Sequence, residues 1–512
     1  PTVFVFIPKR SADDLRHLGA RLALDGRSGL VRAERGFFAH PHLDQLVSLQ
    51  GAGDFGQDAG GDSGDADLNH GPQIVGQGPE EASLFAAEGG NHALASIPAA
   101  APRPLVNICP ARPPDSGARG SAFMKILYGV VGEGMGHATR SRAVLEHLLG
   151  QGHEIKVVVS GRAHKFLTER LAGRPKLSVE EIHGLSLRYF GNRLDKSESL
   201  FHNLKKAPKG IKKNIEVYRK VAEDGFTPEL VVSDFESWAA FYALNHFLPV
   251  VSIDNMQVIN RCRQEKSVTK SRGMNFRIAK LAVKVKMPGA YHYLVTSFFY
   301  PPVRKRRTTL VPPILRPEIL AARREPGDHV LVYQTAANND ELIPTLKKLP
   351  YRFRVYGMGR EGTDGNVTLR AFSESGFVDD LRTARAVIAG GGFSLMSEAV
   401  SLHVPMLSVP IEQQYEQELN ARYLEHLGYG QWAERLDQDV IAGFLARTDE
   451  LSNNLERFAR CDNSMLFACV DELIRRRAAD EPGPDRLDAE AMGKWASPAT
   501  TEPEPISTSG GA

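Results

Sequence analysis

Residues 386–399 read AVIAGGGFSLMSEA, and residues 126–137 read ILYGVVGEGMGH. In both stretches a short apolar run leads directly into several glycines and then into a pattern typical of an amphipathic helix. This order indicates a buried strand, a tight turn and a helix whose free N-terminal amides can hold an anion. Because the two turns lie far apart in the chain, they predict two successive α/β units around a phosphate-bearing ligand.

Strand-like and helical patterns alternate from residue 124 onward. Apolar runs typical of buried strands lie at 126–131, 155–160, 230–233, 250–253, 293–296, 330–335, 353–356, 367–371, 386–389 and 406–409. Helical patterns lie between them, as at 142–149, and two longer ones near 414–427 and 453–478 follow the last strand. Alternation of this kind predicts parallel sheets covered by helices on both faces. The expected fold class is therefore α/β, with two Rossmann-like doubly wound domains facing across a cleft.

Changes in composition predict four segments. Residues 1–123 are rich in glycine, aspartate, proline and alanine with weak periodicity, so we expect a low-complexity, disordered extension. Met124 begins a strong strand pattern, which suggests that the extension lies upstream of the original start codon and takes no part in catalysis. A proline-rich stretch at 300–317 is the expected interdomain linker. The remaining expected segments are an N-terminal Rossmann-like domain at 124–313, a C-terminal Rossmann-like domain with closing helices at 314–480, and a disordered tail at 481–512.

Charge is unevenly distributed along the chain. The formal net charge is +2, but residues 124–322 hold 33 Lys and Arg against 17 Asp and Glu, while the rest hold 30 and 44. This excess predicts that the middle segment meets something anionic. Four scattered cysteines without metal-ligand spacing are typical of a reduced, cytoplasmic protein. No apolar run approaches the roughly 18 to 20 residues of a membrane span, and no signal-peptide pattern opens the chain.

Polar side chains follow the second glycine turn at helical spacing. Ser394 and Glu398 are four residues apart, so they share a helix face close to the anion that the turn would hold. A carboxylate there can accept two hydrogen bonds from a ribose diol. Amides that suit the hydroxyls of a sugar follow at Gln413, Gln417 and Asn420. The alternative is an ordinary strand-to-helix turn beside a solvated glutamate.

The stretch 390–430, GGGFSLMSEAVSLHVPMLSVPIEQQYEQELNARYLEHLGYG, resembles the C-terminal half of GT-B glycosyltransferases of the MurG and glycolipid-transferase group. The resemblance extends over about 124–480 and implies an acceptor domain at 124–313 and a nucleotide-sugar donor domain at 314–480, with Glu398 on the ribose. The residues that it implies at the diphosphate are Gly391, Gly392, Phe393 and Ser394. Those that it implies at the donor sugar, the base and another donor-facing loop are Gln413, Gln417 and Asn420, a loop at Phe377 and Val378, and Gln334.

The first glycine turn and two strand ends offer candidates for a general base. The turn resembles a loop of MurG-like enzymes that touches the acceptor and the donor phosphate, which implies that role for Gly134 and Gly136, although MurG has a shorter, threonine-containing turn. His137 opens the following helix, and the near-neutral pKa of histidine suits proton removal from a hydroxyl. The alternative is a hydrogen bond to a phosphate or a cap. The competing bases are Glu133, Asp234 and Asp254. For the two aspartates, the alternative role is a helix cap or a turn cap.

Two basic segments mixed with apolar residues lie at 205–213 and 266–286. Such segments suit docking on an anionic membrane surface, and the alternative is a solvated face over an ordinary core helix. We do not expect nucleic-acid binding, because no recognition motif accompanies the charge. The expected location is cytoplasmic, peripheral on the inner face of the cytoplasmic membrane.

Together these features predict an inverting glycosyltransferase that moves a hexose or N-acetylhexosamine from a UDP-sugar to a hydroxyl without a metal or another cofactor. UDP is expected because a ribose-binding glutamate in this motif accompanies UDP in the enzymes that the chain resembles. No Asp-x-Asp metal motif occurs in the segments expected to form the cleft. The expected acceptor is a lipid or a cell-envelope glycan precursor. Two alternatives remain, a UDP-sugar 2-epimerase of the same architecture and a protein that binds nucleotide-sugars without turnover.

Overall fold

A computed structural model of the protein describes residues 23–24, 31–32, 123–132, 134–184, 188–190, 193–223, 225–269, 273–334, 340–412 and 414–487. The chain divides into two compact units, Pro1–Asp115 and Ser116–Ala512. In the first unit a short antiparallel pair is described, β1 (Ala23–Leu24) with β2 (Val31–Arg32). The disorder predicted for 1–123 therefore concerns residues that lie almost entirely outside the described ones.

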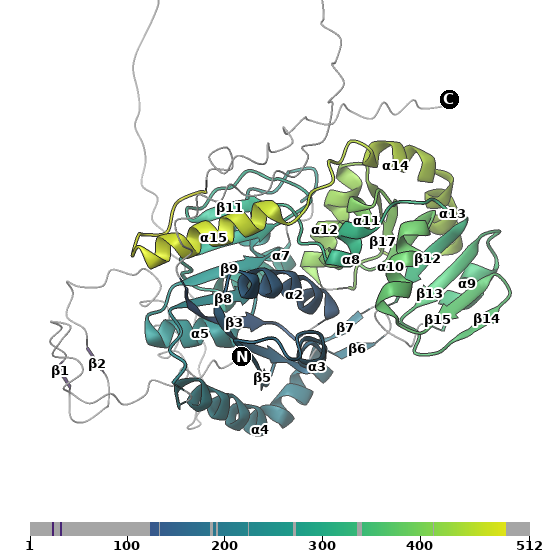
Figure 1. Ribbon diagram of the computed structural model, residues 1–512. Helices are drawn as coiled ribbons and strands as arrows, with labels where there is room; N and C mark the ends of the chain where they lie inside the picture. Colours follow the sequence, from purple (N-terminus) through teal and green to yellow (C-terminus); the bar gives the residue numbers. More distant parts are fainter. Residues whose placement is uncertain are drawn as a thin grey trace, which may run out of the picture. The chain divides into compact units, whose positions relative to one another are not determined.

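The second unit holds two seven-stranded sheets, and the first of them is parallel throughout, in the order β11-β10-β9-β8-β3-β4-β5 (Figure 1). Its strands are β3 (Lys125–Val130), β4 (Glu154–Ser160), β5 (Leu177–Ile182), β8 (Leu230–Asp234), β9 (Val250–Asp254), β10 (His292–Thr296) and β11 (Thr308–Val311). From β3 the chain adds β4 and β5 on one side of the sheet, and from β8 it adds β9, β10 and β11 on the other side, so the direction of winding switches between β3 and β8. Doubly wound sheets bind their ligands at such a switch point, beyond the carboxyl ends of the strands.

The second sheet repeats this arrangement in the order β14-β15-β13-β12-β16-β17-β18. Its strands are β12 (His329–Tyr333), β13 (Arg352–Tyr356), β14 (Gly362–Asp364), β15 (Val367–Arg370), β16 (Ala386–Ala389), β17 (Met406–Ser408) and β18 (Gly430–Trp432). Only β14 pairs antiparallel. The switch point lies between β12 and β16, so the glycine turn after β16 stands where a ligand is expected. A separate antiparallel pair joins β6 (Arg188–Phe190) to β7 (Arg193–Asp195).

Helices fill the connections between the strands, as the alternating pattern predicts. Those of the first half are α2 (Met135–Gly150), α3 (Gly161–Arg170), α4 (Lys196–Glu223), α5 (Ser237–His246), α6 (Gln257–Arg261) and α7 (Met274–Lys286). Those of the second half are α8 (Pro317–Ala321), α9 (Leu342–Lys347), α10 (Glu374–Thr383), α11 (Phe393–Ser401), α12 (Tyr415–His426), α13 (Gln438–Ala446), α14 (Thr448–Leu455) and α15 (Ser464–Ala478). Within the described ranges no helix is both long and apolar enough to cross a membrane.

The predicted α/β fold with two doubly wound halves is confirmed. Each predicted strand is present, and its ends coincide with the prediction or differ from it by one or two residues. The predicted linker at 300–317 was wrong in one respect, because it contains β11. The sequence of β11 is two threonines, a leucine and a valine, which suits an edge strand, and it pairs in parallel with β10. The helical pattern at 453–478 is divided in the structure into α14 and α15.

The last helix of the described chain, α15, returns to the first sheet. Side chains of α15, including Leu473 and Cys469, are fully buried in the same core as β3, β4 and α2, although we expected this helix to close the second domain. Residues 481–487, expected to belong to a loose tail, also lie against this sheet: the Thr308 amide donates to the carbonyl of Asp485, and Tyr291 donates to that of Glu481. Satisfied backbone groups explain why this part of the tail is fixed.

Replacing Leu473 with alanine tests this return of the chain. The change leaves a cavity in the core of the first sheet, so the free energy of unfolding should fall by about 2–5 kcal/mol. Urea denaturation followed by circular dichroism measures it. Leu244→Ala is the matched control, because Leu244 is half exposed and its loss should cost far less. Equal stability of the two variants would contradict the packing of α15 in this core.

Candidate active site

The two glycine turns stand at the two switch points and approach each other. Gly134 precedes α2 with φ of 82°, a conformation that favours glycine. A Cβ added to Gly136 would overlap the side chain of Ser394 at the start of α11. The absence of that Cβ therefore allows the helix that follows β3 to lie against the helix that follows β16.

A buried cluster forms around Asp234, at the carboxyl end of β8. Its Oδ1 lies 2.9 Å from His137 Nδ1. Its Oδ2 accepts from Arg140 Nε at 2.8 Å and from the Ser141 hydroxyl at 3.0 Å. A terminal amine of Arg140 also donates to Oδ1. Both oxygens are thus occupied, and the aspartate is only 1% exposed.

The charges in this cluster set the protonation of its members. Burial alone would raise the pKa of Asp234, but Arg140 and His137 outweigh it and hold that pKa well below its usual range. Burial, and then Arg140, lower the pKa of His137 below 6.5, against the opposing pull of Asp234. At neutral pH the pair is therefore an ionised carboxylate beside a neutral imidazole, the state in which histidine can accept a proton.

The tautomer of His137 decides which of its nitrogens is free. Nδ1 lies 2.7 Å from an Arg140 amine as well as close to Asp234, and it cannot both accept from the first and donate to the second. Arg140 already donates to both oxygens of Asp234. With the proton on Nδ1, the ring donates to the carboxylate and keeps the lone pair of Nε2, which has no hydrogen-bond partner within the described part of the chain.

The other predicted bases have different surroundings. Asp254 is completely buried, its Oδ1 accepts from the amide of Gln257 at 2.8 Å, and its Oδ2 accepts from the Ser252 hydroxyl at 2.6 Å. Burial raises its pKa to about 6, with these hydrogen bonds opposing. The carboxylate therefore serves the start of α6, which is the cap that the sequence left open as an alternative. Glu133 lies outside the described residues.

The second glycine turn is held against α12 by amide side chains. Gln417 Oε1 accepts from the amides of Gly391 at 3.2 Å and Ile411 at 3.1 Å. Asn420 Nδ2 donates to the carbonyl of Gly391 at 3.2 Å, and Asn420 Oδ1 accepts from Asn255 of the first half at 3.3 Å. In this structure Gln417 and Asn420, predicted at the donor sugar, position the turn. Gln413 lies outside the described residues.

Glu416 is a site residue that the sequence assignments omitted. It lies in the first turn of α12, and Asn420 donates to its Oε1 at 3.0 Å. Burial raises its pKa to about 7, and the charge of Arg140 opposes that rise. The signal that could have identified it is its place within the run of amides and carboxylates before Asn420.

Glu398, predicted to bind a ribose, is buried on α11 and paired with Arg316. Arg316 Nε and Nη2 each donate to one of its oxygens at 2.8 Å. Burial raises the pKa of Glu398, with Arg316 opposing. Arg316 was not identified from the sequence, since it lies far from Glu398 in the chain and no spacing links the two. Each carboxylate oxygen retains a lone pair for a further donor.

The residues predicted to meet a base lie on a helix rather than in a loop. Phe377 and Val378 are buried in α10, which begins early because the Ser373 side chain caps it by accepting from the amide of Gly376. The guanidinium of Arg316 lies 5.9 Å from the centre of the Phe377 ring. Gln334 directly follows β12, and its amide donates to the carbonyl of Tyr356 at 3.0 Å.

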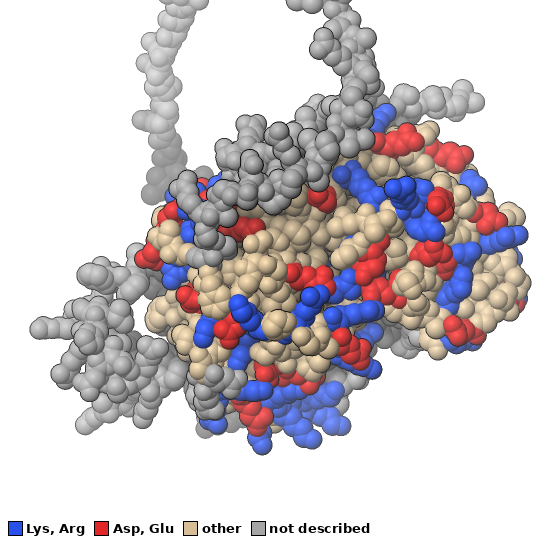
Figure 2. All heavy atoms as spheres, in the orientation of Figure 1, with Lys and Arg blue, Asp and Glu red and all other residues tan. Residues whose placement is uncertain are grey.

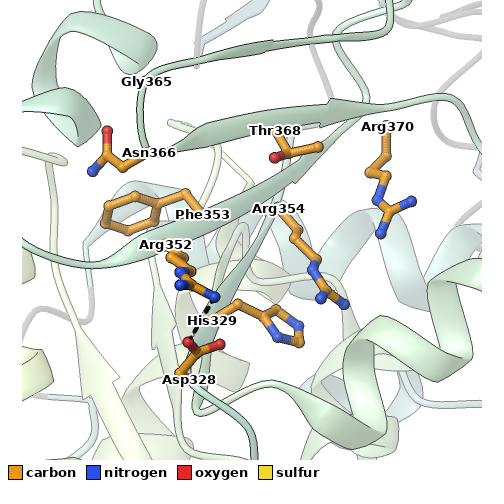
Figure 3. Close-up of a pocket in the computed structure, with 9 residues that line it drawn as sticks. All are labelled: Asp328, His329, Arg352, Phe353, Arg354, Gly365, Asn366, Thr368 and Arg370. Atoms are coloured by element: carbon orange, nitrogen blue, oxygen red, sulfur yellow. Dashed lines mark ion pairs between the residues drawn. The ribbon is translucent and has the colours of Figure 1, made fainter.

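The cavity drawn in Figure 3 lies elsewhere on the second sheet. It has a volume of about 600 Å³, and Arg352 on its wall forms an ion pair with Asp328 at 3.1 Å. Its lining comes from β12, β13, β15 and adjoining turns, namely Asp328, His329, Arg352, Phe353, Arg354, Gly365, Asn366, Thr368 and Arg370. None of these residues belongs to a glycine turn, so the candidate site is not this cavity. No group of His, Cys, Asp and Glu suited to a metal ion occurs among the described residues.

Comparisons with known proteins agree with this arrangement. The family described as "Glycosyl transferase family 1" matches residues 124–449. A glycosyltransferase of Methanosarcina acetivorans, itself uncharacterized, is 29% identical over 342 residues, covering 60% of this chain and 85% of the relative. One from Methanosarcina mazei is 28% identical over 353 residues, with the same coverage.

Solved structures share the fold. A UDP-glucosyltransferase from Polygonum tinctorium has a TM-score of 0.51 at 14% identity, covering 70% of this chain and 99% of the other. Arabidopsis thaliana UGT89C1, complexed with quercetin, has a TM-score of 0.50 at 12% identity, covering 70% and 100%. At such low identity these likenesses establish the GT-B fold and nothing about substrates.

Alanine at two neighbouring glycines tests the packing of the second turn. A Cβ at Gly391 would overlap the backbone of Gln417, so Gly391→Ala should lower the free energy of unfolding by about 1–3 kcal/mol. Gly392 is the matched control, because its φ is −65° and nothing lies within 4 Å of an added Cβ. Chemical denaturation of both variants measures the difference. An equal loss in both would contradict the close approach of α12 to the turn.

Proposed function

Since the chain belongs to the family described as "Glycosyl transferase family 1" and is a glycosyltransferase of GT-B fold, we propose that it is an inverting enzyme that uses a UDP-sugar and no metal. It moves a hexose or N-acetylhexosamine to a hydroxyl of the acceptor. The observation that carries the proposal is the contact between His137 and Asp234 at the first switch point, beside the glycine turn of the second sheet.

His137 acts as the general base in this mechanism. Its Nε2 takes the proton of the acceptor hydroxyl while the hydroxyl oxygen attacks the anomeric carbon. The bond from that carbon to the diphosphate oxygen breaks, UDP departs with the electron pair, and attack from the opposite side inverts the carbon. Asp234 holds the ring through Nδ1 and stabilises the imidazolium that forms.

The leaving diphosphate is stabilised by the start of α11. This helix begins at Phe393, immediately after the glycines, so its first amides and its dipole present positive potential to an anion. Preorganised donors of this kind supply stabilisation where charge develops, without a divalent cation. Gly391, Gly392, Phe393 and Ser394 are the proposed diphosphate residues, with Gly134 and Gly136 opposite them.

The nucleoside and the sugar are held by groups around α11 and α12. Glu398, fixed by Arg316, accepts the ribose hydroxyls through its remaining lone pairs. Phe377, Val378 and Gln334 are the proposed neighbours of the base. At the sugar we propose the polar side chains at the start of α12, which are Gln413, Glu416, Gln417 and Asn420.

An anionic membrane surface is the proposed place of the acceptor, which is a lipid or a cell-envelope glycan precursor. Lysines are exposed along α4, at 205, 206, 209 and 212. Figure 2 shows basic side chains gathered over this helix, at the bottom of the view. Each basic residue near an anionic surface contributes about 1 kcal/mol of attraction. This basic face supports the membrane location, which gives a lipid acceptor access to the protein.

The surroundings of the aspartates disfavour the epimerase alternative. Hydrogen bonds that stabilise the ionised form of a carboxylate make it a weaker base for proton abstraction at the sugar. Asp234 and Asp254 both have their two oxygens occupied by hydrogen bonds from the protein.

His137→Gln tests the base. Turnover, measured as UDP release, should fall by about 10²–10⁴-fold, while the affinity for UDP measured by calorimetry stays near that of the wild type. In the wild type, kcat should rise as pH increases through the pKa of His137, which lies below 6.5, and level off at neutral pH. Asp254→Asn is the control and should retain turnover, because that carboxylate serves α6. A larger loss in Asp254→Asn than in His137→Gln would make Asp254 the base.

The donor and the absence of a metal are tested together. We expect UDP release from one UDP-sugar of a panel, dependent on added bacterial membrane lipids and unchanged within about twofold by EDTA. Loss of turnover in EDTA that Mg²⁺ or Mn²⁺ restores would overturn metal independence. Conversion of the UDP-sugar without any acceptor would favour the epimerase, and UDP binding without any turnover would favour the non-catalytic alternative.

A further inference from the structure

Helix α7 carries an apolar face that no other part of the described chain covers. Its members lie at spacings of four, three and four residues, which places them on one stripe of the helix. They are Met274, Ile278, Leu281 and Val285, exposed to 66, 55, 61 and 50%. These four are close to half of the nine large apolar side chains that the described residues expose, so the stripe is a concentrated feature.

The opposite face of the same helix is packed. Val283 is almost completely buried, as is Met287 directly after the helix. The ring of Phe276 lies 5.3 Å from that of Tyr415 at the start of α12. The helix is therefore held to the fold by its inner face, while the four residues of the outer stripe remain at least half exposed.

All charged residues of α7 are basic. Arg277 and Lys284 lie along one edge of the stripe, and Lys286 lies beyond the other edge, with Lys280 nearer the packed face. An apolar stripe bordered by cations is the pattern of a helix that lies in the headgroup region of a bilayer. A second copy of this chain would bring the same cations against each other in a symmetric contact, so charge complementarity favours an anionic lipid surface.

We propose that α7 is an interfacial anchor that seats this glycosyltransferase on an anionic lipid bilayer through Met274, Ile278, Leu281 and Val285. The four side chains enter the boundary between headgroups and acyl chains, and the neighbouring cations meet lipid phosphates. The sequence predicts only that the segment 266–286 suits a membrane; the packing of α7 identifies which face docks.

The ends of α7 connect this surface to the candidate site. Phe276 contacts α12, where the proposed sugar residues begin, and the Lys286 ammonium lies 4.2 Å from the ring centre of Phe235, the residue after Asp234. Seating α7 on a bilayer thus holds both sides of the site near the lipid. This consequence for the acceptor rests on the proposed function, whereas the binding of α7 to lipid does not.

Flotation of the full-length protein with lipid vesicles tests the anchor. Vesicles of phosphatidylcholine alone are compared with vesicles that contain about one-third phosphatidylglycerol. The wild type should float with the anionic vesicles, less so at high salt. Ile278→Ser combined with Leu281→Ser should weaken this partition at least tenfold, and Arg277→Gln combined with Lys284→Gln should weaken it and reduce its salt dependence.

A matched control removes two exposed apolar side chains elsewhere. Leu244→Ser combined with Phe247→Ser, exposed to 50 and 82% in the wild type, should leave the partition unchanged. Unchanged binding of the Ile278/Leu281 variant would overturn the proposal and assign any lipid binding to another surface, such as the lysines of α4. A dimer in sedimentation without lipid, lost in the same variant, would overturn it in favour of a second copy.

The same samples separate this inference from the proposed function. UDP release from the donor, measured with the bacterial membrane lipids dispersed in detergent instead of vesicles, should be equal in the wild type and the Ile278/Leu281 variant. A wild type that floats with anionic vesicles but releases no UDP with any sugar would refute the proposed function alone. A wild type that turns over but does not float would refute the anchor alone.

Discussion

One buried carboxylate, Asp234, fixes the geometry of the site. It ends β8 at the switch point of the first sheet, and a charge left unpaired at such depth would be strongly destabilising. All the side-chain donors that it has among the described residues come from a single helix, α2, through His137, Arg140 and Ser141. Because all three donors must face Asp234, α2 can pack on the sheet in only one orientation about its own axis. The position of the histidine is therefore a consequence of pairing a charge, and the chemistry uses an arrangement that folding already requires.

Polar and aromatic contacts between the two halves carry that geometry across to the second sheet. Asn255 donates to Asn420, and the rings of Phe299 and Tyr423 stack with centres 3.9 Å apart. On another side Arg142 of α2 pairs with Glu318 at 2.6 Å, and Glu374 lies 3.6 Å from the same guanidinium. Because Glu374 also lies 3.6 Å from Arg316, the helix that presents His137 and the arginine that orients Glu398 share a partner.

Local patterns were enough to predict the inner strands of both sheets, since buried parallel strands need continuous runs of Val, Ile and Leu and each run ends in a recognisable turn. The four edge strands, β5, β11, β14 and β18, were not predicted, because they lack such runs. They also indicated both glycine turns. They could not indicate Arg140 or Arg316, because an ion pair across distant segments leaves no periodic signal. Asp254 shows a further limit: a carboxylate at a strand end has the same sequence signature whether it serves a substrate or the next helix. Phe377 lies in helix α10, which the side chain of Ser373 caps. A loop was predicted there because this cap was overlooked in the sequence.

The return of α15 to the first sheet has a consequence for how the protein is made. The core around β3 and β4 includes Leu473 and Leu487, so it lacks part of its apolar filling until the end of the described chain has left the ribosome. The first half leaves the ribosome early, and the apolar surface that α15 later covers stays exposed to solvent while the second half is synthesised. We therefore expect the folding of the first half to depend more on translation speed and on chaperones that cover apolar surface than the folding of the second half, although its strands are synthesised earlier.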